Sequence, residues 1–117
     1  MKRGEIWTVA GARDYAGKPR PSLIIQDEAF DATDSITICG FTSDLAAASF
    51  IRFTVQPTAE NGLFVPCDVM VDKITTVPRS KLGRKIGDLH PDDITKLNRA
   101  IMIFLGIANL PNAAIER

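Results

Sequence analysis

The sequence has few of the residues on which several kinds of active site depend. It contains one histidine and two cysteines in 117 residues. A single histidine excludes a ribonuclease site that uses two histidines as acid and base. Cys39 and Cys67 form neither a CxxC motif nor a ligand spacing typical of zinc. We therefore expect no metal and no other cofactor, and we expect both cysteines to be reduced core residues.

An excess of one charge and a long apolar run are also missing. The 14 basic residues balance the 14 acidic ones, so no overall field attracts nucleic acid or a membrane. An anionic partner must then bind a local patch, and basic residues do gather near the start and again within residues 73–85. The longest apolar run, residues 100–110, is shorter than the roughly 20 residues of a membrane span. With no signal-peptide pattern at the start, these features predict a cytoplasmic protein without membrane association.

Familiar catalytic motifs are absent as well. The sequence has no G-x-S-x-G, Walker A or H-E-x-x-H motif, which excludes the commonest signatures of hydrolases, phosphate-binding loops and metalloproteases. The acids within residues 27–34 could bind Mg²⁺, but a solvated polar loop has the same composition. His90 precedes Pro91 and two aspartates, which favours a helix cap over a catalytic role.

The hydrophobic pattern predicts a mainly β protein that ends in one helix. Runs typical of strands cover residues 4–9, 22–26, 36–41, 50–55, 69–76 and 84–89. The run at 22–26 is continuously apolar, so we expect its strand to be buried on both faces. Asn61 and Gly62 predict a tight turn, and residues 78–83 predict a turn or a single helical turn stopped by Gly83.

The helix has the clearest boundaries in the sequence. It is predicted to begin after His90, with Pro91 in the first turn, and to end near Gly106. Short strands with one helix imply a small, strongly curved antiparallel sheet or barrel with the helix packed on it. We expect a single domain over residues 1–108 and a loose tail over 109–117.

Arg20 is the first candidate site residue, because it lies between two prolines directly before the apolar run. Pro21 disfavours the helical region for Arg20 and Pro19 fixes its own φ, so this backbone is predicted to be extended and stiff. Thr42 and Ser43 follow another strand. If the two strand ends are neighbours, a guanidinium and two hydroxyls would form a site suited to a phosphate. A loop arginine beside an ordinary strand is the alternative, and these residues alone do not decide between the two.

The order of four motifs resembles the MazF/PemK/Kid family of toxin endoribonucleases. The motifs are residues 2–7 (KRGEIW), 20–26 (RPSLIIQ), 41–43 (FTS) and 72–82 (DKITTVPRSKL), and the resemblance extends from residue 2 to about 105. It implies an SH3-like antiparallel barrel, a homodimer, and the toxin of a type II system whose antitoxin covers the basic groove with a disordered acidic segment. The implied activity is sequence-specific, metal-independent cleavage of single-stranded RNA. In that reaction the 2′-OH attacks and leaves a 2′,3′-cyclic phosphate and a 5′-OH.

The resemblance also assigns roles to individual residues. Arg20 and Thr42 correspond to the catalytic pair, with Ser43, Asp72 and Asp14 as supporting groups. The residues expected to bind RNA are Lys18, Tyr15, Arg79 and Lys81, with Phe50 as a second aromatic that could stack on a base.

Two departures from the family pattern place the chain nearer the MazF branch. Where the Kid/PemK branch has an Arg-x-Asp pair, this sequence has Met70, Val71 and Asp72 and retains only the acid. Asp14 and Tyr15 stand where relatives often have His or Glu, which leaves the acceptor of the 2′-OH proton unassigned. The rival hypothesis is a non-enzymatic toxin or binding module like CcdB on the same fold. Such proteins lack the arginine and proline before the strand paired with the later Thr-Ser, and this chain has both.

Overall fold

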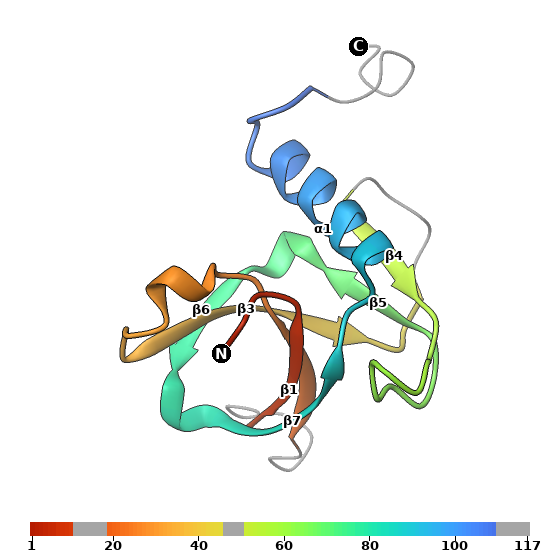
Figure 1. The fold of residues 1–117 in the computed structure, drawn as a ribbon. Coiled ribbons are helices and arrows are strands. Elements are labelled where there is room, and N and C mark those ends of the chain that lie inside the picture. The colour runs from red at the N-terminus through yellow and green to blue at the C-terminus, as the bar shows by residue number, and fades with distance from the viewer. Residues whose placement is uncertain (11–18, 46–50, 110–117) are drawn as a thin grey trace.

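The structure is a computed structural model, and it describes residues 1–10, 19–45 and 51–109. Within these residues, seven antiparallel strands form one strongly curved sheet, followed by a single α-helix (Figure 1). The strands are β1 (Glu5–Val9), β2 (Arg20–Ile24), β3 (Ser35–Thr42), β4 (Arg52–Val55), β5 (Cys67–Met70), β6 (Thr75–Pro78) and β7 (Leu82–Asp88). Their order in the sheet is β4-β5-β3-β2-β1-β7, and β6 also pairs with β3. The prediction of a mainly β fold with a C-terminal helix is confirmed.

β3 is the longest and most central strand. β2 pairs with it along one edge, while its other edge is shared by β6, opposite Ser35 to Ile38, and β5, opposite Phe41 and Thr42. The prediction of one continuous strand over residues 69–76 is therefore wrong, because the single helical turn η3 (Val71–Lys73) separates β5 from β6. The turn directs the buried Val71 side chain into the core.

The core consists of two clusters, one on each face of β2. Leu23 belongs to the main cluster, whereas its neighbour Ile24 belongs to a smaller one with Val9, Ile36 and Ile38. Both residues are fully buried. The continuously apolar run was therefore a correct sign of a strand that is covered on both faces.

The helix α1 (Pro91–Phe104) begins and ends where the sequence predicted. His90 is its N-cap, and its Nδ1 accepts a hydrogen bond from the Asp92 backbone N–H at 3.0 Å. Leu97 and Ala100 are buried on the face that packs against η3 and β4. Gly106 follows at a φ of 75°, a conformation that favours glycine after a helix. No helix among the described residues is long and apolar enough to cross a membrane.

The connection from β4 to β5 is longer than the tight turn predicted at Asn61 and Gly62. Residues 56–66 form a loop that packs against β7 and so fills the space between the two ends of the sheet. The Asp88 backbone N–H donates to the Glu60 carbonyl at 2.8 Å, and a Cβ on Gly87 would lie 2.3 Å from the Asn61 carbonyl carbon. Glycine at position 87 therefore permits the loop to approach β7 this closely.

The helical turn predicted within residues 78–83 is present as η4 (Arg79–Lys81). It ends at Leu82, where β7 starts, and Gly83 already lies in that strand. The glycine therefore does not stop the turn. A Cβ at this position would lie 2.4 Å from the Thr8 Oγ1, so Gly83 allows β7 to lie close to β1.

Candidate active site

The pairing of β2 with β3 brings the two candidate strand ends together. Leu23 pairs with Cys39 and Ser22 with Gly40, which is the last pair of this ladder. Continuing the same antiparallel register by two residues places Arg20 opposite Thr42. Arg20 is also paired with Val9 of β1, so its backbone is held in the sheet. The strand ends are thus neighbours, as a shared anion site would require.

The Thr42 side chain lies on the outer face of β3, and its hydroxyl acts as an acceptor in its hydrogen bond to Asp44. The preceding residue, Phe41, is buried in the main core, so alternation along the strand directs the Thr42 side chain away from that core. Its Oγ1 accepts a hydrogen bond from the Asp44 backbone N–H at 3.1 Å. A hydroxyl that accepts one hydrogen bond can still donate its proton to a phosphate oxygen. Ser43, the next residue, is exposed.

Arg20 and Ser43 both line a groove of about 1050 Å³. This volume lies at or above the upper end of the roughly 300–1,000 Å³ typical of small-molecule sites, so the groove has room for more than one nucleotide. Its walls come from β1, β2, the end of β3, the 56–66 loop and β7. The lining residues are Thr8, Pro19, Arg20, Pro21, Phe41, Ser43, Gly62, Leu63, Phe64, Val65, Cys67, Gly83, Arg84, Lys85 and Ile86.

The loop wall of the groove is held by one buried amide. Asn61 is 3% exposed, and its Oδ1 accepts hydrogen bonds from the backbone N–H groups of Thr58 and Leu63, each at 3.0 Å. Its Nδ2 donates to the Gln56 carbonyl at 2.8 Å. Gly62 has a φ of 71°, and a Cβ there would lie 2.2 Å from the Ile86 carbonyl oxygen. The asparagine and glycine that suggested a tight turn instead fix a groove wall.

The β7 wall supplies two cations of different availability. Lys85 Nζ lies 3.1 Å from Asp88 Oδ1 and 3.5 Å from Glu5 Oε2. The hydrogen bond to Asp88 raises the pKa of Lys85. Among the described residues, no carboxylate forms an ion pair with Arg84, whose backbone N–H donates to Thr8 Oγ1 at 3.0 Å. Arg84 is therefore the better placed of the two to meet an anion in the groove.

Asp72 does not line the groove, and an arginine already binds it. Arg52 Nε donates to Asp72 Oδ1 at 2.9 Å and Arg52 Nη2 to Asp72 Oδ2 at 3.1 Å. The hydrogen bonds from Arg52 hold the pKa of Asp72 below its ordinary value, which makes this carboxylate a weak base. Arg52 is the cross-strand partner of Met70, so β4 supplies an arginine beside the position where the sequence has methionine.

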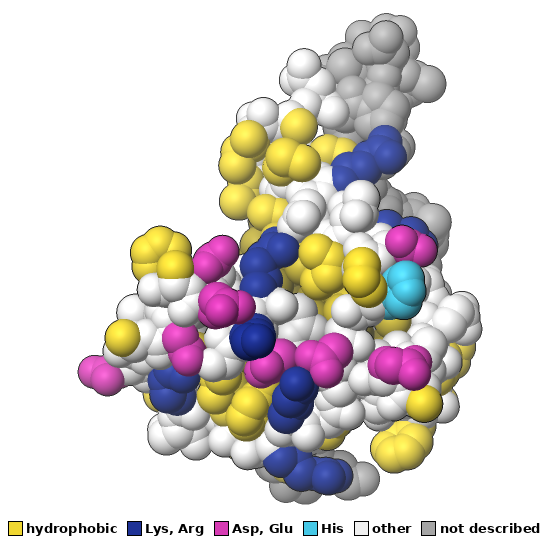
Figure 2. Space-filling view, in the orientation of Figure 1, with side chains coloured by type: hydrophobic (Ala, Val, Ile, Leu, Met, Phe, Trp, Pro, Cys, Tyr) yellow, Lys and Arg dark blue, Asp and Glu magenta, His cyan; other side chains and the backbone are white. Residues whose placement is uncertain are grey.

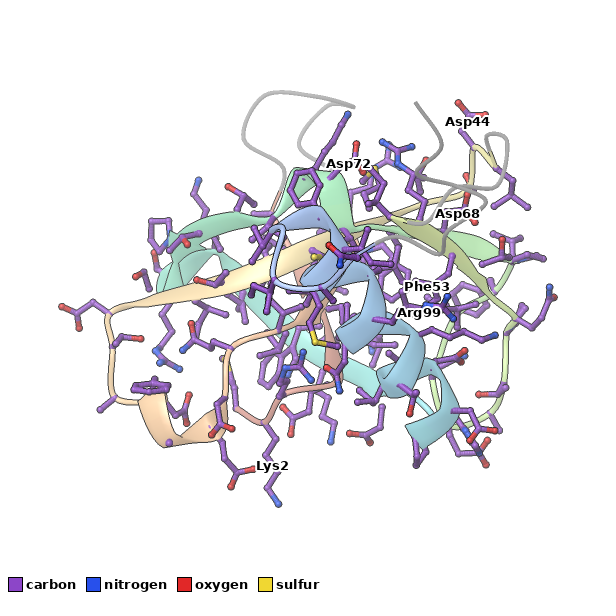
Figure 3. All side chains as sticks on the ribbon, turned by 90° about the horizontal axis from the view of Figure 1, so that it is seen from above. Lys2, Asp44, Phe53, Asp68, Asp72 and Arg99 are labelled. Atoms are coloured by element: carbon purple, nitrogen blue, oxygen red, sulfur yellow. The ribbon has the colours of Figure 1, made fainter. Side chains whose placement is uncertain are left out.

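Asp72, Asp68 and Asp44 lie on the same side of the molecule in Figure 3, and all three carboxylates raise the pKa of Arg52, Asp72 first through its hydrogen bonds. Asp68 is the cross-strand partner of Thr42 on one side and of Thr54 on the other, and it accepts a hydrogen bond from the Thr54 hydroxyl at 2.5 Å. Asp68 is only 3% exposed, and none of the three aspartates is among the described residues that line the groove.

Neither Arg79 nor Lys81 is among the described residues that line the groove. β6, which precedes Arg79, pairs with the Ser35 end of β3, at the opposite end of that strand from Thr42. Arg79 donates to Asp31 Oδ1 at 3.1 Å and, through Nε and Nη2, to the Thr33 carbonyl at 3.0 and 2.7 Å; it also donates to the Asp31 carbonyl. These contacts give Arg79 a role in holding the 28–34 segment.

Lys81 lies closer to Arg20. Its backbone carbonyl accepts a hydrogen bond from the Ala10 N–H at 2.9 Å, next to Val9, which pairs with both Arg20 and Leu82. Binding of RNA by Arg79 and Lys81 stays a prediction, and only the placement of Arg79 does not favour it.

Four residues named from the sequence, Asp14, Tyr15, Lys18 and Phe50, lie outside the described residues.

The two cysteines and the acids within residues 27–34 have structural rather than catalytic environments. Cys39 and Cys67 are buried free thiols, and burial raises the pKa of Cys39 to about 12, so neither is a ready nucleophile. Of the acids within residues 27–34, Asp27 caps the helical turn η2 (Glu28–Phe30) and Asp31 pairs with Arg79 and the N-terminal ammonium. The described part of the chain has no group of three or more His, Cys, Asp or Glu side chains that could hold a metal.

Sequence reasoning missed the aromatic and aliphatic wall made by Phe64 and Val65. These residues are 96% and 48% exposed and lie in the loop before β5, although their residue types are ones that favour strands. Pro66 agrees with the loop, since proline disfavours a central strand. No pattern in the sequence indicates that this loop faces Arg20.

Comparison with known proteins identifies the family to which the sequence is similar. The sequence profile of a family described as PemK-like, MazF-like toxins of type II toxin-antitoxin systems matches residues 2–105. A protein named probable endoribonuclease MazF, from Mycolicibacterium smegmatis, is 47% identical over 108 residues, which cover 92% of this chain and 99% of the relative.

Solved structures of similar fold agree with this result. The Mycobacterium tuberculosis toxin MazF-mt6 has a TM-score of 0.74 and 27% identity, with 87% of this chain and 96% of that chain covered. An endoribonuclease solved in complex with its cognate antitoxin, from a mycobacterial species, has a TM-score of 0.76 and 22% identity, with 94% and 99% covered. The second likeness concerns the fold alone.

Proposed function

Because this chain belongs to the PemK-like, MazF-like toxins of type II toxin-antitoxin systems, we propose that it is an endoribonuclease that cleaves single-stranded RNA in the groove beside Arg20 and Thr42. The observation that carries the proposal is the groove that Arg20 and Ser43 line, at the end of β3 where the β2 register, continued by two residues, sets Thr42 opposite Arg20. The relatives named endoribonuclease support the reaction class.

The proposed reaction is an internal transfer of the phosphate. The ribose 2′-oxygen attacks the adjacent phosphorus and the bond from phosphorus to the 5′-oxygen breaks. The products are a 2′,3′-cyclic phosphate and a 5′-OH. A base must accept the 2′-OH proton, and the leaving 5′-oxygen must gain one. Membership of the family is the basis for proposing that the cleavage needs no metal.

Arg20 and Thr42 have the chemistry that the transition state requires. Negative charge grows on the non-bridging oxygens as the fifth bond to phosphorus forms. A guanidinium stays charged and offers a planar fork of N–H donors to two of these oxygens. The Thr42 hydroxyl would donate to one of the same oxygens, and the exposed Ser43 hydroxyl would assist. The base remains unassigned, because Asp14 lies outside the described residues and Asp72 is bound by Arg52.

The proposal includes two protein partners. The first is a cognate antitoxin, supported by the solved structures of similar fold that contain one, with an acidic segment that the cations of the groove would attract. The second is another copy of this chain. Met102, Phe104, Leu105 and Ile107 are exposed at the C-terminal end of α1, and Figure 2 shows apolar side chains gathered over that end. A homodimer would remove this apolar surface from water.

A cleavage assay in the presence of a chelator tests the proposed reaction. Purified protein is incubated with a long single-stranded RNA in EDTA, and a matched RNA with 2′-deoxy nucleotides serves as the control. We expect fragments that carry 5′-OH and 2′,3′-cyclic phosphate ends from the RNA, and no fragments from the deoxy strand. RNA that stays intact, or cleavage that EDTA abolishes, would contradict the proposal.

A further inference from the structure

We propose that Phe64 is a base-stacking platform of the groove, which binds the base of the nucleotide beside the cleaved phosphate with a modest preference set by stacking strength. This inference rests on the proposed function, because it places a base of the same RNA strand on a second wall of the same groove. It adds an RNA-binding residue that neither the catalytic pair nor the loops named from the sequence include.

The exposure of Phe64 is extreme for an aromatic side chain. It is 96% exposed, compared with 65% for Phe30 and 43% for Phe104. A scattered exposed apolar residue is common on protein surfaces, so exposure alone does not indicate a site. Phe64 differs from Phe30 and Phe104 because it lines the groove that also contains Arg20 and Ser43.

The backbone that leads to Phe64 is fixed by its neighbours. The preceding residue, Leu63, is 7% exposed and belongs to the main core, and its backbone N–H donates to the buried Asn61 side chain. Gly62, one residue earlier, packs its backbone directly on Ile86 of β7. The loop therefore needs no large backbone rearrangement on binding, and only the Phe64 side chain has to be ordered, which lowers the cost of using it as an aromatic anchor.

The charges of the groove favour an anionic occupant. Its described lining contains the cations Arg20, Arg84 and Lys85, and none of these described lining residues is acidic. A strand of RNA combines a repeated negative charge with flat aromatic bases, and every base has a face that can stack on a phenyl ring. An acidic peptide would satisfy the cations but has no comparable need for an exposed aromatic ring. The combination therefore favours single-stranded RNA.

Substitution of Phe64 tests this role. Phe64→Ala removes the ring, Phe64→Trp keeps a larger stacking surface, and Phe30→Ala removes an exposed phenylalanine that lies outside the groove. Each protein is assayed on one long single-stranded RNA, with kcat/KM measured and the 5′ ends of the fragments mapped. We expect Phe64→Ala to lower kcat/KM roughly 5- to 150-fold, the range for loss of one stacked base. The base preference at one position next to the cut should become weaker.

The controls separate recognition from folding and from the wider proposal. Phe64→Trp should retain the cutting pattern, Phe30→Ala should match the unmodified protein, and the melting temperature of Phe64→Ala should not fall, because the ring is not packed. If the unmodified protein cuts RNA and Phe64→Ala does so with the same kcat/KM and pattern, the Phe64 proposal is wrong while the proposed function stands. Unchanged cleavage with weaker antitoxin inhibition or a weaker dimer would also overturn it, because a protein would then be the occupant. An unmodified protein that leaves RNA intact would contradict the proposed function itself.

Discussion

The two ends of β3 each lie beside an arginine, and the surroundings of these arginines differ. At the Ser35 end, Arg79 binds a carboxylate and two backbone carbonyls of the 28–34 segment. At the Thr42 end, Arg20 is exposed and lines a groove that also contains a serine hydroxyl and two other cations. Arg52 is a third case and is bound by both oxygens of Asp72.

This comparison shows that the position of an arginine within a family motif does not determine its task. Arg79 belongs to the 72–82 motif and Arg20 to the 20–26 motif, and both were assigned to the site from the sequence. The structure gives Arg79 a carboxylate and carbonyl partners in the 28–34 segment, which it holds in place. Arg20 instead lines the groove together with Ser43, Arg84 and Lys85.

Loss of Arg20 should give the largest effect on activity. We expect Arg20→Ala to lower kcat/KM for RNA cleavage by about 100- to 1,000-fold, the usual result of removing one charged or hydrogen-bonding group that stabilises a transition state. Arg20→Lys keeps the charge but loses the planar fork, so its activity should lie between that of Arg20→Ala and that of the unmodified protein. Initial rates on a long RNA at subsaturating concentration measure the ratio.

The matched control is Arg79→Ala in the same assay. If Arg20→Ala still cleaves RNA as strongly as the unmodified protein, the cleavage does not depend on this site. If it loses cleavage but still arrests growth as strongly, the CcdB-like alternative gains support. A similar loss of kcat/KM in Arg79→Ala would remove the distinction between the two ends of β3.

Loss of Arg79 should affect stability instead. Arg79→Ala deletes charged hydrogen bonds to Asp31 and Thr33, so we expect the free energy of unfolding to fall by about 1–3 kcal/mol. Cleavage by the protein that remains folded should be unchanged. Urea unfolding followed by circular dichroism gives the first quantity. If Arg79→Ala is as stable as the unmodified protein, the contacts of Arg79 do not contribute to the free energy of unfolding.

The smallest expected effect is the acid dependence of the Arg52–Asp72 pair. The hydrogen bonds from Arg52 lower the pKa of Asp72 below its ordinary 3.8, so the pair contributes stability above that pH and loses it as the pH falls through the lowered value. Asp72→Asn should therefore be less stable at pH 7, by at most about 1 kcal/mol for a partly exposed pair.

The difference between Asp72→Asn and the unmodified protein should narrow as the pH falls below about 4 and close below the lowered pKa of Asp72. Urea unfolding of both proteins at pH 7, 5 and 3 measures it, with Asp34→Asn as an exposed carboxylate control. A difference that is the same at all three pH values would contradict a charge-dependent origin.

Much of the fold could be predicted because it depends on local patterns. His90, Pro91 and Gly106 fixed the ends of α1, and the continuous apolar run predicted the buried strand β2. The break between β5 and β6 was not predicted, because Asp72 and Lys73 are only a short interruption in a segment otherwise rich in β-forming residues. That turn is set by tertiary contacts: Val71 is buried in the core, and Arg52, which is distant in the sequence, binds Asp72.

The candidate site was only partly predictable for the same reason. The prolines beside Arg20 and the hydroxyls after β3 were visible, but their alignment depends on the register of two strands. The groove wall around Phe64 depends on the hydrogen bonds of Asn61 and on the glycines that let the loop pack against β7. These contacts have no signature in the sequence. The neutralisation of Arg79 depends on Asp31, 48 residues away.

The most direct test of the Arg20–Thr42 site is a crystal structure of the protein with a single-stranded RNA that carries a 2′-deoxy nucleotide at the cleaved position. This substitution removes the attacking hydroxyl and leaves the phosphate to be located. We expect that phosphate to lie in the groove, with its oxygens about 2.7–3.0 Å from the Arg20 guanidinium and the Thr42 Oγ1. A phosphate bound at Arg79, or an RNA strand that runs outside the groove, would contradict this account.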